Sequence, residues 1–212
     1  MYIIFDLDDT LIDTSGSITP KALKWALSKI GDQLPLEELL ELNDNASSSE
    51  EAIQTFLTKH HSLEYIELAK NALDHYPIET VTPLANALEV VRDLAQDHTL
   101  AVVTAGRHAQ QLLKFEKAGF SKNDFFSIDV TQMRSKKLIY QHLQKKWNVD
   151  PVKIFVVGDR IATDLQPAKE LGMQTVHMRW GRGRNNTGLK TDVDYTIDTL
   201  TQLKTIAYDH KA

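Results

Sequence analysis

Residues 2–10 read YIIFDLDDT, an apolar run that ends abruptly in acidic side chains. Its hydrophobicity is continuous rather than alternating, which is typical of a strand buried on both faces of a sheet. Two later apolar runs, at residues 101–103 and 154–157, lead in the same way into Thr104 and Asp159. Ligands of open α/β sheets bind at the carboxyl ends of the strands. Provided that the three strands are neighbours, we expect these polar residues to meet in one crevice.

The rest of the chain extends this pattern. Apolar runs predict strands at residues 2–5, 99–103, 153–157, 174–178 and 194–197. From residue 83 on they alternate with helical patterns, at residues 83–96, 107–118, 136–147, 163–171 and 200–207. This alternation predicts the α/β class, with a Rossmann-like, doubly wound parallel sheet that is covered by helices.

Residues 16–77 interrupt the alternation. They contain helical spacing of apolar residues and no strand-like run, so they predict a helical module inserted after the first strand. The segments 1–15 and 78–212 then form the α/β core domain. A length of 212 residues is compatible with one main domain and a smaller insertion.

Composition excludes several classes of protein. The chain has no cysteine, which excludes disulfides, thiolate zinc sites and a thiol nucleophile. A net charge of −5 argues against a general nucleic-acid surface, and the apolar runs are too short to span a membrane. The first residues carry no basic leader, so we expect no secretory signal and a cytoplasmic location. The sequence does not indicate an oligomeric state.

Converging carboxylates at the strand ends would require a cation. Two unit charges about 4 Å apart repel each other by about 4 kcal/mol at an effective dielectric constant near 20. Oxygen ligands without cysteine or a paired histidine motif suit Mg²⁺, which leaves coordination positions for water and substrate phosphate. A carboxylate beside a metal-held phosphoryl group is an arrangement for nucleophilic phosphoryl transfer.

Four motifs carry a family resemblance. They are Asp6-x-Asp8-x-Thr10, Thr104, Lys136 and Gly158-Asp159-x-x-x-x-Asp164. Together they resemble the haloacid-dehalogenase superfamily, in its phosphatase branch with a small helical cap. The resemblance spans residues 1–14 and 83 to about 200, and it implies that residues 16–77 form the cap.

The resemblance also implies roles for the residues of these motifs. Asp6 would attack phosphorus, and Asp8 would protonate the leaving oxygen and then activate water. The Mg²⁺ ligands would be Asp6, the main-chain carbonyl of Asp8 and Asp159. The phosphoryl oxygens would be bound by Thr104, the Ala105 amide and Lys136. Asp164 would order metal-bound water or Lys136.

The third and second motifs depart from the family pattern. Arg134, Lys136 and Lys137 all lie near the expected lysine, and the proline that often follows it is absent. We select Lys136 over Lys137 because it stands at a predicted helix start, 23 residues before Asp159. Ala105 stands where many relatives have asparagine, which leaves only a backbone donor there.

The resemblance implies a Mg²⁺-dependent phosphatase that hydrolyses a small phosphomonoester through an aspartyl-phosphate. An aspartate two positions after the nucleophile marks phosphatases and phosphomutases within the family. A phosphomutase acting on a phosphosugar and a non-catalytic phosphate-binding module remain the alternatives. The substrate could be a phosphometabolite, a sugar phosphate or a nucleotide, because the selecting side chains would lie in the cap.

A second glycine-rich stretch, residues 181–184, does not support a dinucleotide site. Its third glycine position is Asn186, and no helical pattern follows directly. The arginines of this stretch and Arg179 favour a solvated loop over a site for a nucleic acid or a substrate anion.

Overall fold

The computed structural model describes residues 1–31, 34–133, 135–185 and 190–209. Its chain forms two compact units: Met1–Asp13 with Val81–Ala212, and Thr14–Thr80. Within the described ranges, all strands belong to the first unit and the second is helical. None of the described helices is both long and apolar enough to cross a membrane.

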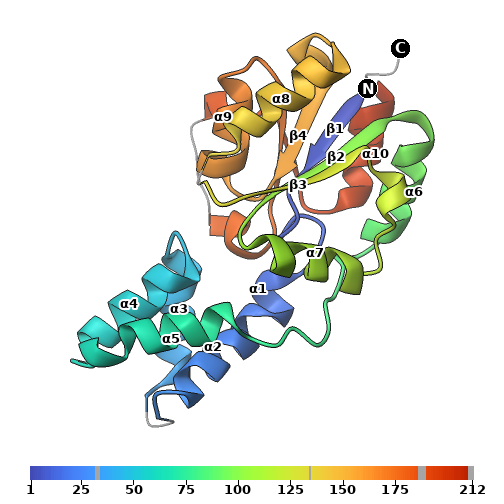
Figure 1. The fold of residues 1–212 in the computed structure, drawn as a ribbon. Helices are drawn as coiled ribbons and strands as arrows, with labels where there is room; N and C mark the ends of the chain where they lie inside the picture. The colour runs from blue at the N-terminus through green and yellow to red at the C-terminus, as the bar shows by residue number, and fades with distance from the viewer. Residues whose placement is uncertain (32–33, 134, 186–189, 210–212) are drawn as a thin grey trace. The chain divides into compact units, whose positions relative to one another are not determined.

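The first unit is built on a six-stranded parallel sheet with the order β3-β2-β1-β4-β5-β6 (Figure 1). The strands are β1 Tyr2–Phe5, β2 Thr99–Ala105, β3 Ser127–Thr131, β4 Ile154–Gly158, β5 Gln174–Met178 and β6 Tyr195–Ile197. The strand order reverses between β1 and β4, as it does in Rossmann-like folds. The predicted α/β class with a doubly wound parallel sheet is confirmed.

Helices cover both faces of this sheet. They are α6 Ala87–Asp97, α7 His108–Lys117, α8 Lys137–Trp147, α9 Gln166–Lys169 and α10 Leu200–Asp209. In Figure 1, α8 and α9 lie on one side of the sheet, and α6 and α10 lie on the other. On the α8 and α9 side, Ile4 and Val156 of the sheet share a buried cluster with Tyr140 and Leu165. The central strands are therefore enclosed, which explains their continuous apolar runs.

Strand β3 was not predicted from the sequence. Its residues are SIDVT, of which only Thr131 is buried, and within the described residues β3 pairs with β2 alone. An edge strand of this kind carries no continuous apolar run, so the pattern used for the other strands does not detect it.

The predicted helix over residues 163–171 is also different in the structure. A π-helical turn, Ile161–Leu165, comes first and is followed by the short helix α9. Short 3-10 turns complete the described elements: Leu63–Tyr65, Lys122–Asp124, Pro151–Lys153, Gly181–Asn185 and Lys190–Asp192.

The second unit has a hydrophobic core of its own. Its helices are α1 Thr14–Ser17, α2 Thr19–Ser28, α3 Leu36–Asn45, α4 Ser49–Lys59 and α5 Ile66–Asp74. Each of the four longer helices contributes to this core, with Leu23, Leu39, Phe56 and Ala69 all fully buried. The amphipathic spacing in the sequence thus corresponds to helices that bury one face against each other.

Candidate functional site

Three neighbouring strands bring sequence-predicted residues to one edge of the sheet. Asp6 directly follows β1, Thr104 lies near the end of β2, and Asp159 directly follows β4. Parallel pairing of β1 with both β2 and β4 holds these positions at the carboxyl edge, where the strand order reverses. This is the edge at which open α/β sheets bind their ligands.

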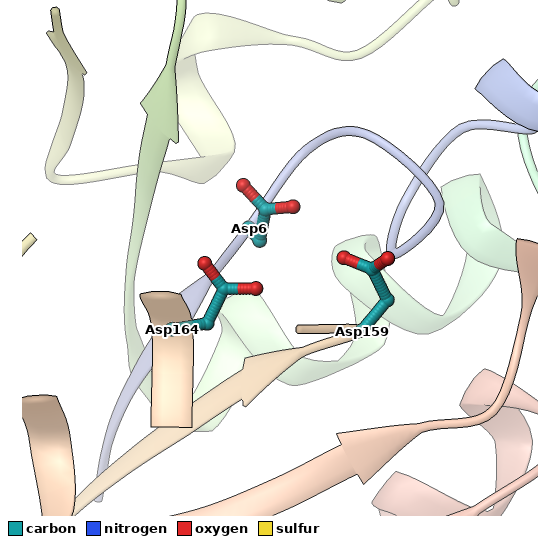
Figure 2. A group of neighbouring side chains, drawn as sticks. All are labelled: Asp6, Asp159 and Asp164. Carbon is teal, nitrogen blue, oxygen red and sulfur yellow. The ribbon is translucent and has the colours of Figure 1, made fainter. Parts of the chain in front are cut away.

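Three buried carboxyl groups lie together at this edge. Asp6, Asp159 and Asp164 each offer a carboxylate oxygen, and these oxygens lie within 4.8 Å of one another. Figure 2 shows the three side chains, with Asp6 on the loop after β1 and Asp159 at the end of β4. The role expected for Asp164 from the sequence, that it orders metal-bound water or Lys136, stays a prediction; its carboxylate oxygen lies within 4.8 Å of that of Asp6.

A buried lysine forms ion pairs with two of these carboxylates. Lys136 directly precedes α8, and its Nζ lies 2.5 Å from Asp6 Oδ1 and 2.7 Å from Asp164 Oδ1. The adjacent Lys137 is half-exposed and forms an ion pair with Glu170 instead. The geometry therefore brings Lys136 to the cluster and Lys137 away from it, while Arg134 lies outside the described residues.

Burial dominates the electrostatics of the cluster. It raises the pKa of Asp6 to about 7, against the opposing effect of the Lys136 ammonium. Burial, followed by the charges of Asp164 and Asp6, raises the pKa of Asp159 well above its usual range. Burial lowers the pKa of Lys136, but the two carboxylates beside it prevail and hold it well above the usual value. The cluster thus has one ammonium, in contact with two of its three carboxyl groups, which leaves a deficit of positive charge.

The spacing of Gly158, Asp159 and Asp164 has a steric reason. A Cβ on Gly158 would lie 2.6 Å from the Cβ of Asp164, so only glycine leaves room for that side chain. The π-helical turn then brings Asp164 back over the strand end, where its Oδ2 accepts a hydrogen bond from the Arg160 amide at 3.0 Å. In this motif Asp164 thus packs directly against Gly158, and the Arg160 amide holds its carboxylate in place.

His177 supports Asp159 from the neighbouring strand and was not predicted. It is buried at the end of β5, and its Nε2 lies 3.1 Å from the main-chain oxygen of Asp159. Burial lowers the pKa of the imidazole, which favours the neutral form. A polar residue inside the apolar run at residues 174–178 was the only sequence signal for it.

The Asp8 carboxylate is bound by helix α7 rather than by the acidic cluster. Lys114 Nζ lies 2.8 Å from Asp8 Oδ1 and 3.1 Å from Oδ2, and Gln111 Nε2 donates to Oδ2 at 2.8 Å. Neither Gln111 nor Lys114 was predicted as a site residue from the sequence. Gln111 shares a buried helix face with Phe115, so a polar residue at an apolar helical position was the available signal.

The predicted phosphate-binding positions on β2 adjoin the same glutamine. Thr104 is buried, and its hydroxyl accepts a hydrogen bond from Gln111 Nε2 at 3.1 Å. The main-chain oxygen of Ala105 accepts from the same nitrogen at 2.6 Å. The contacts of Thr104 and Ala105 with a phosphoryl group stay predictions.

The arginine-containing loop after β5 is held by local contacts. Arg179 forms a two-pronged ion pair with Asp198 at 2.9 and 2.7 Å, and Arg184 lies over the ring of Trp180. A Cβ on Gly183 would lie 3.0 Å from the Cβ of Asp159, so the loop packs closely against the site. Asn186, which sequence reasoning used against a dinucleotide loop, lies outside the described residues.

The donor set fits a hard divalent cation. Only carboxylate and carbonyl oxygens are available from Asp6, Asp159, Asp164 and the backbone, which is the chemistry that Mg²⁺ prefers. A cation held at this strand-end edge would in turn attract an anionic ligand such as a phosphate group.

Comparisons with known proteins indicate the family of this chain. The family model described as haloacid dehalogenase-like hydrolase matches residues 3–178. Glyceraldehyde 3-phosphate phosphatase from Pyrococcus furiosus is 28% identical over 95% of this chain and 90% of its own length. The same enzyme from Methanocaldococcus jannaschii is 26% identical over 99% and 97%.

Solved structures share the fold. A predicted phosphoglycolate phosphatase from Haemophilus somnus superposes with a TM-score of 0.80 at 20% identity, over 97% of both chains. A haloacid dehalogenase-type hydrolase from Bacillus subtilis, solved with bound magnesium, gives 0.70 at 18% identity over 98% of both chains.

The chain belongs to the haloacid dehalogenase-like hydrolase family. The family predicted from the four motifs is thus confirmed. The prediction of a hydrolase for phosphoric monoester bonds is confirmed as well, since the curated relatives that span nearly the whole chain are phosphatases.

Proposed function

We propose that this protein is a Mg²⁺-dependent phosphatase that hydrolyses a small phosphorylated metabolite through an aspartyl-phosphate on Asp6. The observation that carries the proposal is the buried Asp6 carboxylate at the carboxyl edge of the sheet, 2.5 Å from Lys136 Nζ. A nucleophilic carboxylate has to stay close to a positive charge so that an anionic phosphate can approach it.

The first chemical step would transfer the phosphoryl group to the protein. An oxygen of Asp6 forms a bond to phosphorus while the bond from phosphorus to the ester oxygen breaks, and Asp8 gives its proton to that leaving oxygen. Thr104, the Ala105 amide and Lys136 bind the phosphoryl oxygens and compensate their charge. Such transfer depends mainly on positioning and charge neutralisation, which these groups supply.

The second step would regenerate the enzyme. Asp8 takes a proton from a water molecule, the water oxygen forms a bond to phosphorus, and the bond between phosphorus and Asp6 breaks. Inorganic phosphate leaves, and Asp6 returns as a carboxylate. One aspartate thus serves first as acid and then as base. The Asp8 carboxyl group therefore has to lie close to the leaving oxygen in the first step and to the attacking water in the second.

Asp6, Asp159 and the main-chain carbonyl of Asp8 would hold the Mg²⁺ ion. When bound, the ion supplies positive charge for the phosphoryl oxygens. Asp164 would keep Lys136 in place, because its Oδ1 lies 2.7 Å from the lysine Nζ. The buried excess of carboxyl groups supports the proposed cation.

The substrate class follows from the relatives and from the chain organisation. Relatives aligned over nearly the whole chain are glyceraldehyde 3-phosphate phosphatases, so triose phosphates are the first candidates within the small phosphometabolites. We propose that the helical unit, residues 14–80, acts as the cap that selects among them. A cytoplasmic location stays a prediction from the sequence.

Release of inorganic phosphate from a panel of phosphomonoesters tests the function. With Mg²⁺ we expect phosphate release from p-nitrophenyl phosphate, and a higher kcat/KM for a triose phosphate than for nucleotides. A sugar phosphate that is isomerised without phosphate release would instead identify a phosphomutase. Binding of phosphate without any turnover would identify a non-catalytic module.

Metal binding gives a prediction that does not depend on turnover. We expect Mg²⁺ to raise the melting temperature, since ligand at about 100 times its dissociation constant stabilises a protein by about 2.7 kcal/mol. Asp159→Asn should remove most of this shift, because it takes one of the three clustered carboxylates away. Differential scanning fluorimetry against Mg²⁺ concentration measures the effect.

Asp44→Asn is the matched control for the metal prediction. Asp44 is exposed in the helical unit, so the variant should show the wild-type response to Mg²⁺. An equal response in Asp159→Asn and the wild type would contradict the proposed metal site.

A further inference from the structure

Helix α7 contributes two side chains to the site that the four motifs do not include. Gln111 and Lys114 both bind the Asp8 carboxylate, from positions three residues apart and therefore on one face of the helix. Lys114 contacts both carboxylate oxygens, at 2.8 and 3.1 Å. With three short contacts, the carboxylate is held in one orientation.

Gln111 also links Asp8 to the predicted phosphate site. Its Nε2 lies 2.8 Å from Asp8 Oδ2, 3.1 Å from Thr104 Oγ1 and 2.6 Å from the Ala105 oxygen. When the Thr104 hydroxyl accepts from Gln111, its own hydrogen stays available for another acceptor, such as a phosphoryl oxygen. The amide has two hydrogens for these three acceptors, so the shorter contacts, to Ala105 and Asp8, take one each and the Thr104 hydroxyl shares one of them.

The local structure accommodates this glutamine at a cost. Gln111 is almost fully buried, and its Oε1 has no hydrogen-bond partner among the described residues. A buried carbonyl oxygen without a partner is unfavourable, so a purely structural role would be served better by an apolar side chain. Gly106 makes room for the amide, because a Cβ there would lie 2.8 Å from Gln111 Nε2.

We propose that Gln111 and Lys114 are positioning residues that orient Asp8 for proton transfer to the leaving oxygen. The inference rests on the proposed phosphatase function. In the first step, the bond between phosphorus and the ester oxygen breaks as Asp6 bonds to phosphorus, and the Asp8 proton moves to that oxygen. An alkoxide leaving group depends on this proton, whereas p-nitrophenolate is stable enough to leave without it.

The test compares kcat/KM for glycerol phosphate and p-nitrophenyl phosphate in the holoenzyme with Mg²⁺. This quantity reports formation of the aspartyl-phosphate, the step in which the leaving group departs. We expect Lys114→Met and Gln111→Met to lower the ratio of the alkyl ester to the aryl ester by roughly tenfold or more, within the 10²- to 10⁴-fold range of a general acid. Lys114→Arg keeps the cation and should restore part of the ratio.

Lys117→Met is the matched control, since Lys117 is exposed on the same helix, and it should leave the ratio unchanged. Equal losses on both esters in Lys114→Met and Gln111→Met would overturn the inference, because they would indicate a general structural effect. A fall in the ratio with a wild-type melting temperature supports it. A wild-type protein that releases no phosphate from either ester would overturn the proposed function itself, and the inference with it.

Discussion

Asp6→Asn should lower phosphatase turnover by roughly 10⁴-fold or more, because the variant has no carboxylate that can form the aspartyl-phosphate. The substitution keeps the shape of the side chain, so binding of substrate and the fold should persist. Steady-state kinetics with p-nitrophenyl phosphate and a triose phosphate measures the loss. Asp6→Ala is the second variant, since an asparagine can deamidate to restore the acid.

Asp6→Asn should not destabilise the protein in the absence of Mg²⁺. Burial raises the pKa of Asp6 to about 7, well above the ordinary value for an aspartate. A group with a raised pKa in the folded state contributes stability below its unfolded pKa, and this stability is lost as the pH rises through about 7. At pH 8 the variant should therefore be at least as stable as the wild type towards urea.

A loss of turnover without a loss of stability would identify Asp6 as a functional residue rather than a structural one. Lys136 keeps its contact with Asp164 in the variant, so the buried ammonium is not left alone. Turnover by Asp6→Ala within tenfold of the wild type would exclude Asp6 as the nucleophile.

Lys136→Met has the second largest expected effect, and it changes activity and stability in the same direction. Loss of one preorganised donor to the phosphoryl group lowers kcat by about 10²- to 10³-fold. The substitution also leaves Asp6 and Asp164 buried without their shared cation, which typically costs about 3–5 kcal/mol of stability. Urea unfolding and kinetics below the melting temperature separate the two effects.

Lys137→Met is the matched control for this prediction. Lys137 is the next residue along the chain, but its ion pair with Glu170 is half-exposed. Pairs of this kind contribute about 0–1 kcal/mol, so the control should lose at most about 1 kcal/mol of its free energy of unfolding. Its kcat should stay within about twofold of the wild type. A larger loss of kcat in Lys137→Met than in Lys136→Met would assign the phosphoryl-binding role to Lys137 instead.

The sequence predicted every strand of the described sheet except β3. β1, β2 and β4 carry continuous apolar runs because both of their faces are covered, and their order along the chain identifies a doubly wound fold. β3 was not predicted because its residues, SIDVT, alternate polar and apolar side chains and form no continuous apolar run. The π-helical turn before α9 was not predicted because its spacing resembles that of an ordinary helix.

Within the site, the sequence identified those residues that directly follow a strand. Asp6, Thr104 and Asp159 could be assigned to one edge because parallel strands end together. Gln111 and Lys114 could not, because their contacts with Asp8 join residues more than 100 positions apart, and helical spacing does not say what a helix faces.

The sequence by itself determined the class of fold, the family and the acidic residues at the strand ends, since each depends on local order and spacing along the chain. Only the tertiary structure decided which of two adjacent lysines enters the cluster, how Asp164 returns over Gly158, and that α7 binds Asp8. The physical reason is that neighbouring residues on a helix point about 100° apart. The packing of α7 and α8 against the sheet therefore selects the side chains that reach the site.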